Sequence, residues 1–196
     1  MRNRLLLLTL PALVAGLLVS GCGSSQSAAD KAAQQATQEE KNPPTISDPE
    51  VPVPKAEKVE PGPGEGDINT KPKIPAQEGQ PPSELIAQDV IVGTGAQAKS
   101  GDKVSVQYVG VLFDGGEEFD TSWTSDTKAG TPFEFTLGSG QVIAGWDQGV
   151  VGMKEGGRRR LLIPADLAYG EAGSPPKIPA NAALVFDVDL KKVSGG

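Results

Sequence analysis

Apolar residues are distributed very unevenly along this chain. Residues 5–19 form an apolar run with few interruptions, and residues 23–82 contain no aromatic residue. The two Trp, two Tyr and five Phe residues all lie between Tyr108 and Phe186. Because large apolar side chains build protein cores, the folded domain is predicted to lie in the second half of the chain.

Several segments of this second half alternate apolar and polar residues, with the period of a β-strand. The alternation is clearest after residue 183, where Leu184 and Phe186 point to one face and Val185 and Asp187 point to the other. Asp114 and the two glycines after it predict a hairpin turn, because glycine accepts the positive φ of tight turns. Strands are predicted over residues 84–92, 103–113, 133–137, 158–163 and 184–190.

Only residues 143–153 have a helical pattern, with Trp146 and Val150 four residues apart on one face. Many strands and one short helix indicate an α+β domain, in which an antiparallel sheet closes over the helix.

Three arginines, 158–160, begin one predicted strand. Since successive side chains of a strand point to opposite faces, we expect at least one of them to lie on a solvated face.

The apolar run near the N-terminus is typical of a signal peptide, because it follows Arg2 and Arg4 and is short for a membrane span. Small residues precede Cys22, the only cysteine, as in the bacterial lipobox. The resemblance implies that residues 1–21 are removed and that Cys22 carries diacylglycerol and palmitate. The protein would then be anchored by lipid in the cell membrane or outer membrane, facing the extracytoplasmic side. The alternatives are an ordinary secretory signal and an uncleaved anchor helix.

Residues 22–83 have the composition of a disordered tether. The first part is rich in alanine, glutamine and charge, and residues 42–82 are rich in proline. Such sequences bury too little apolar surface to offset the entropy lost on ordering. We expect a spacer that adds nothing to the stability of a domain at residues 84–196. Low-complexity filler and a proline-rich ligand are the alternatives.

Composition narrows the possible chemistry. The net charge of −7 argues against nucleic-acid binding, which needs clustered basic residues. The chain has no histidine, so the commonest general base and metal ligand is missing, and one cysteine allows no internal disulfide. We expect no cofactor and no metal.

From about Gly101 to Val193 the chain resembles the FKBP-type peptidyl-prolyl isomerases, small immunophilins inhibited by tacrolimus and rapamycin. The resemblance rests on six motifs: Val106-Gln-Tyr-Val-Gly110, Phe119-Asp120, Phe133-x-Phe-x-Leu-Gly138, Val142-Ile-x-Gly-Trp146, Ala168-Tyr-Gly170 and Leu184-Val-Phe-Asp187. It implies a twisted antiparallel β-sheet half-wrapped around one short α-helix, which agrees with the pattern of elements.

The resemblance also implies roles for individual residues. Trp146 resembles the pocket floor, the Ile143 N–H and the Tyr169 hydroxyl resemble donors to substrate carbonyls, and Asp120 resembles a carboxylate inside the pocket. The catalytic set is Asp120, Tyr169, Ile143, Trp146 and Phe186, and the substrate-binding set is Tyr108, Phe119, Phe133, Val142 and Ile178.

The chain departs from the family pattern in three places. The arginine that often pairs with the aspartate has no counterpart, and the 121–132 loop is longer than in the smallest members. Ser174 and Lys177 stand where many members have histidine and an aliphatic residue. These changes bear on substrate and drug preference rather than on the fold.

Prolyl isomerisation suits a pocket without histidine. The X–Pro bond rotates over a barrier of about 18–20 kcal/mol because rotation breaks amide resonance, and no acid, base or nucleophile is needed. We therefore expect a lipid-anchored isomerase acting on proline-containing segments of exported proteins. It would be monomeric, able to bind tacrolimus or rapamycin, and without affinity for nucleic acid. The alternative is a proline-peptide-binding chaperone or scaffold with incidental turnover; the small domain argues against a solute-binding lipoprotein.

Overall fold

The computed structural model describes residues 53–126 and 128–195; the predicted leader, Cys22 and the tether as far as residue 52 lie outside them. None of the helices in these two ranges is long and apolar enough to cross a membrane. The strands are β1 (Glu57–Lys58), β2 (Ile86–Ile91), β3 (Lys103–Leu112), β4 (Glu118–Thr121), β5 (Trp123–Ser125), β6 (Lys128–Ala129), β7 (Phe133–Thr136), β8 (Arg158–Ile163) and β9 (Leu184–Ser194). The helices are α1 (Ala144–Gly149) and the short 3₁₀ turns η1 (Ala165–Leu167) and η2 (Gly170–Ala172).

One sheet organises the described residues, in the order β1-β2-β8-β9-β3-β4, with β7 also paired to β3. All its pairings are antiparallel except the short parallel pair β1–β2. The predicted strands and the α+β class are confirmed. The long 121–132 loop holds a further small hairpin, β5–β6, which the sequence pattern did not predict.

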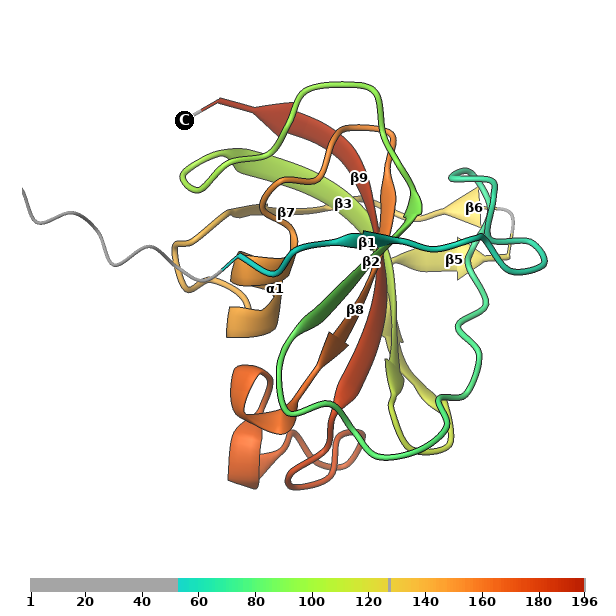
Figure 1. The fold of residues 1–196 in the computed structure, drawn as a ribbon, viewed down its shortest axis with the longest axis vertical. Helices are drawn as coiled ribbons and strands as arrows, with labels where there is room; N and C mark the ends of the chain where they lie inside the picture. Colours follow the sequence, from blue (N-terminus) through green and yellow to red (C-terminus); the bar gives the residue numbers. More distant parts are fainter. Residues whose placement is uncertain (1–52, 127, 196) are drawn as a thin grey trace, which may run out of the picture. The chain divides into compact units, whose positions relative to one another are not determined.

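The helix α1 packs on one side of the sheet (Figure 1). It is shorter than predicted, ending at Gly149, and Gly152 just beyond it has φ of 84°, which a helix does not accommodate. Contact with β8 is close: a Cβ on Gly145 would lie 2.5 Å from Ile163, and one on Gly149 would lie 2.6 Å from Leu161. The two glycines therefore set how deeply Trp146 enters the core.

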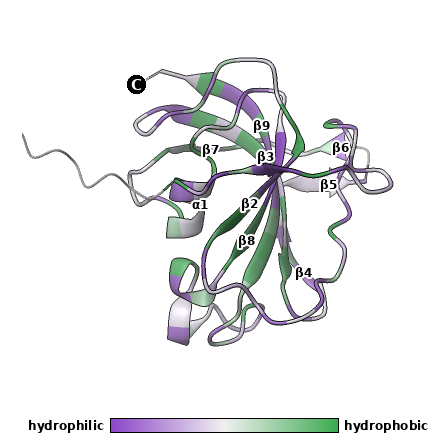
Figure 2. Cartoon of the chain, viewed as in Figure 1, coloured by the Kyte–Doolittle hydropathy of each residue, from purple (hydrophilic) through white to green (hydrophobic). Residues whose placement is uncertain are grey.

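Two apolar clusters fill the two sides of the sheet. The larger contains Trp146, Val150 and the residues of β8 and β9 that face α1. The smaller lies on the other side and contains Trp123, Leu162 and Val185, with Ile74 packed against it. Figure 2 shows the hydrophobic colouring on β8 and the neighbouring strands, and hydrophilic colouring along many of the connecting loops.

The expectation of a solvated arginine face is wrong. Arg158, Arg159 and Arg160 are 0%, 5% and 8% exposed. The side chains do alternate: Arg159 reaches the carbonyl oxygens of Gly149 and Val151, whereas Arg158 and Arg160 pair with aspartates of β9. The second face is buried as well because another segment covers it.

That segment is part of the predicted tether, so the prediction of a disordered tether is wrong for residues 56–74, which we call the strap. The strap begins beside β2 through β1 and continues on the side of the sheet opposite α1 (Figure 1). Glu65 within it is 5% exposed. The strap has few apolar side chains and is held by polar contacts, which composition alone does not predict.

Candidate active site

A cavity of about 440 Å³ opens at the start of α1. Trp146 in the first turn of α1 is buried, and the ring centroids of Tyr108 and Phe186 each lie 5.2 Å from its own, edge-on to it. Phe133 and Tyr169 are exposed. The lining residues are Tyr108, Phe119, Asp120, Phe133, Gln141, Val142, Ile143, Trp146, Tyr169 and Phe186.

A glycine on β3 makes the aromatic wall possible. The rings of Phe119 and Phe186 meet edge to face, with centroids 5.5 Å apart. Both rings lie over Gly110, where a Cβ would come within 2.6 Å of Phe186 and 2.8 Å of Phe119. Any side chain at this position would push the two rings out of the wall.

Of the carboxylates in the described part of the chain, only that of Asp120 lines the cavity. Its Oδ2 accepts a hydrogen bond of 2.8 Å from the Tyr108 hydroxyl, and its Oδ1 accepts one of 2.9 Å from the Thr121 N–H. The Tyr108 phenol thus binds the carboxylate directly. Burial, followed by the hydrogen bond to Asp120, raises the pKa of Tyr108 above its ordinary value, so the phenol stays a protonated donor well into the alkaline range.

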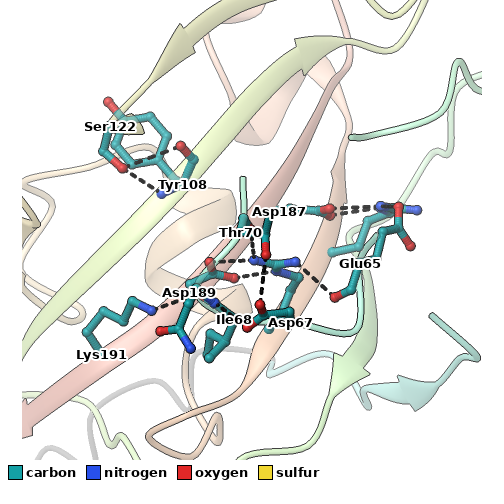
Figure 3. A network of polar contacts seen from close by, with 12 residues as sticks. Glu65, Asp67, Ile68, Thr70, Tyr108, Ser122, Asp187, Asp189 and Lys191 are labelled. Carbon is teal, nitrogen blue, oxygen red and sulfur yellow. Dashed lines mark hydrogen bonds and ion pairs between the residues drawn. The ribbon is translucent and has the colours of Figure 1, made fainter. Parts of the chain in front are cut away.

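A buried polar network holds this pair from behind. The Tyr108 N–H donates to Ser122 Oγ at 2.9 Å (Figure 3), and Ser122 Oγ in turn donates to the side-chain oxygen of Gln107. The amide nitrogen of Gln107 donates to the carbonyl of Gly130 at 2.8 Å. Gln107 therefore joins β3 to both ends of the 121–130 segment, which includes the β5–β6 hairpin.

The loop before α1 presents Val142 and Ile143 to the cavity. Asp147 in the first turn of α1 accepts hydrogen bonds of 2.9 Å from the N–H groups of Gly138 and Gly140, which fixes the loop. Ile143 caps the helix, and its carbonyl accepts the Trp146 N–H at 2.9 Å. Within the described residues the Ile143 N–H has no hydrogen-bond partner, so it is available as a donor.

Ile178 is placed differently from the other predicted site residues. It is buried in the larger core cluster and lines a neighbouring cavity of about 350 Å³, which shares Phe119, Asp120 and Tyr169 with the first. Lys177 beside it donates to the carbonyl of Phe119 at 2.7 Å, which ties this loop to β4.

The structure brings the other nine predicted side chains around one cavity: Asp120, Tyr169, Ile143, Trp146, Phe186, Tyr108, Phe119, Phe133 and Val142. Gln141 also lines it and was missed. Its side-chain oxygen accepts the Thr136 N–H at 3.1 Å, and a single glutamine in a glycine-rich loop has no pattern that would reveal this.

The site combines a deep aromatic floor, one phenol-bound carboxylate and one free backbone N–H. Such a cavity holds an apolar ring and offers donors to neighbouring carbonyl groups. Among the described residues, its lining holds no nucleophile paired with a base.

Comparisons with known proteins agree with this reading of the site. Residues 94–191 match the family described as FKBP-type peptidyl-prolyl cis-trans isomerase. The chain is 52% identical over 124 residues to the FK506-binding protein of Streptomyces anulatus, covering 63% of this chain and 97% of that protein. It is 52% identical over 97 residues to peptidyl-prolyl cis-trans isomerase FKBP2 of Homo sapiens, covering 50% of this chain and 65% of that one. The chain belongs to the family of FKBP-type peptidyl-prolyl cis-trans isomerases.

Proposed function

We propose that this isomerase acts on X–Pro bonds of exported polypeptides and that the proline ring packs on Trp146. The aromatic wall removes water from the amide. Water favours the planar, charge-separated form, so desolvation favours the twisted one. The rest of the acceleration comes from contacts that fit the twisted amide better than the planar one. The convergence of nine predicted side chains on one cavity carries this proposal.

The polar groups have separate roles in the proposed mechanism. The free N–H of Ile143 and the hydroxyl of Tyr169 donate to substrate carbonyl groups on either side of the rotating bond. The carboxylate of Asp120, bound by the Tyr108 phenol, lies in the wall and stabilises the altered charge of the twisted amide. No proton is transferred in any step.

A protease-coupled peptide assay tests the site. Asp120→Asn and Tyr169→Phe should each raise the barrier by about 1–2 kcal/mol, as expected for one lost polar contact, with the domain still folded. Glu117→Gln is the matched control, because Glu117 lies exposed in the turn that precedes β4. Undiminished activity in the folded Asp120→Asn, Tyr169→Phe double variant would show that the assigned roles are wrong.

The same assay separates catalysis from plain binding. If the protein were only a chaperone or scaffold, it would bind proline peptides, but its turnover would stay near the uncatalysed rate. Rapamycin or tacrolimus should inhibit turnover by occupying the cavity. Inhibition without displacement of bound peptide would place substrate binding elsewhere.

We further propose that Cys22 is the lipid-carrying first residue of the mature chain, holding the domain on the extracytoplasmic side of a membrane. The support is the only cysteine of the chain, preceded by small residues and a short apolar run. Two or more acyl chains give durable anchoring where one chain binds marginally. Fractionation should find a Cys22→Ser variant released from the membrane; retention would rule out the lipid anchor.

A further inference from the structure

The face of the sheet opposite α1 carries an unusual set of buried charges. Arg158 binds Asp189 through two nitrogens, at 2.5 and 2.8 Å, and Arg160 binds Asp187 through two nitrogens, both at 2.8 Å. All four side chains are buried. Each guanidinium has five N–H groups in a fixed plane, so an aspartate alone does not satisfy it.

The strap supplies the missing acceptors. Arg160 donates to the carboxylate of Glu65 at 2.6 Å. Arg158 donates to the carbonyl of Glu65 at 2.9 Å and to that of Thr70 at 2.8 Å. Figure 3 shows Glu65 and Thr70 beside Asp187 and Asp189, with Lys191 bound to the carbonyl of Ile68 at 2.8 Å.

Without the strap this face carries more positive than negative charge: Arg158, Arg160 and Lys191 are positive, and Asp187 and Asp189 are negative. The strap adds the carboxylates of Glu65 and Asp67. That of Glu65 also accepts the Gly62 N–H at 2.8 Å, which fixes the turn that carries it. Removing one partner of an ion pair buried to this degree strongly destabilises the fold, because the other charge is left unpaired. The face is thus a binding site for an acidic segment of polypeptide, and residues 62–70 occupy it.

The far end of the strap holds the wall of the active site. The Lys71 N–H donates to the carbonyl of Asp126 at 2.9 Å, in the turn between β5 and β6. The Lys71 ammonium pairs with Glu118 at 2.9 Å, two residues before Asp120 on β4. Ile74 packs on the cluster that contains Trp123 of β5.

We propose that the strap is a docked part of the catalytic domain, bound through Glu65 to Arg158 and Arg160, and that Lys71 is a positioning residue for the wall that carries Asp120. The positioning role rests on the proposed function; the docking does not. The strap joins the sheet at residue 57 and the wall at residue 71, so it couples the chain that precedes the domain to the active site.

Hydrogen exchange in the full chain, purified in detergent, tests the docking. Glu65→Ala should speed exchange of the Val59 and Lys71 amides by on the order of tenfold or more, because both hydrogen bonds depend on a docked strap. Glu65→Gln, which keeps the shape and loses the charge, should give a smaller increase and remains testable if the alanine variant does not fold. Glu60→Gln is the control, since Glu60 is exposed. Exchange in the folded Glu65 variants equal to that of the control would overturn the docking.

Enzyme kinetics test the positioning role. Lys71→Met should lower kcat/KM by about two- to fivefold, the effect of one partly exposed ion pair, and speed exchange over residues 121–126. Lys71→Arg should restore both, and Lys73→Met, an exposed lysine of the same segment, should change neither. Activity of Lys71→Met equal to that of Lys73→Met would refute positioning. A wild-type chain without isomerase activity would refute the proposed function and leave the exchange result on docking standing.

Discussion

At the scale of the residue, the active site depends on side chains whose neighbours change their chemistry. Tyr108 is an aromatic wall residue by sequence, but its hydroxyl binds Asp120 and its N–H is fixed by Ser122. A neutral phenol therefore holds the carboxylate of Asp120.

The raised pKa of Tyr108 predicts that its hydroxyl loses its proton only at high pH. The folded-state pKa lies above the unfolded value of about 10, so the stabilising contribution is complete below pH 10 and is lost as the pH rises through the folded value. The chain has two tyrosines, so absorbance at 295 nm in Tyr169→Phe isolates Tyr108. Ionisation should begin above pH 10.

The control is Tyr108→Phe, in which this high-pH transition should be missing. The rate should stay nearly flat from about pH 6 to 8, since the chain has no histidine to titrate there. A steep pH–rate profile in that window would contradict the mechanism.

At the scale of the element, one buried side chain, that of Gln107, binds both ends of the 121–130 segment. The β5–β6 hairpin is short, and its register is irregular. Gln107 is 1% exposed and supplies both an acceptor to Ser122 and a donor to Gly130. Removing it would leave partly buried polar groups of the segment without partners.

Gln107→Leu should therefore destabilise the domain by about 1–3 kcal/mol and loosen the hairpin first. Denaturant unfolding measures the loss, and hydrogen exchange over residues 121–130 locates it. The control is Thr124→Val, which deletes an exposed hydrogen bond to the carbonyl of Lys128 in the same hairpin and should cost little. An equal effect of both substitutions would mean that the network is not the clamp.

At the scale of the whole molecule, the folded domain extends further toward the N-terminus than its aromatic residues indicate. The strap lies in the same compact unit as the sheet. If Cys22 is anchored, residues 23–55 are left to span the gap between the membrane and the domain, at most about 120 Å fully extended.

Removal of the strap should therefore lower stability. We expect fragment 84–196 to unfold roughly 10 °C below fragment 48–196, because the Glu65–Arg160 pair is buried and breaking such a pair costs about 3–5 kcal/mol. Calorimetry measures both midpoints. Fragment 23–196 serves as the control and should match 48–196. Equal midpoints for the two shorter fragments would restore the original prediction of a passive tether.

The sequence by itself determined the strands β2, β3, β7, β8 and β9, the position of helix α1 and the aromatic side chains of the cavity. The alternation of Leu184, Phe186 and Val188 records burial on the face toward α1, and the family motifs name residues that meet in one cavity. The tendency of a side chain to be buried follows from its type, so these features can be predicted from single residues. The length of α1 and the position of Gln141 in the wall are harder to predict, because both depend on neighbouring residues.

Only the tertiary structure decided what lies on the other face. Asp187 and Asp189 have the pattern of solvated residues, as do Arg158 and Arg160, yet all four are buried. Charged groups are buried only when partners satisfy them, and Glu65 stands far from these partners in the sequence. Pairing across such separations follows from the fold, so a proline-rich segment with one suitably placed glutamate is part of the domain despite its composition.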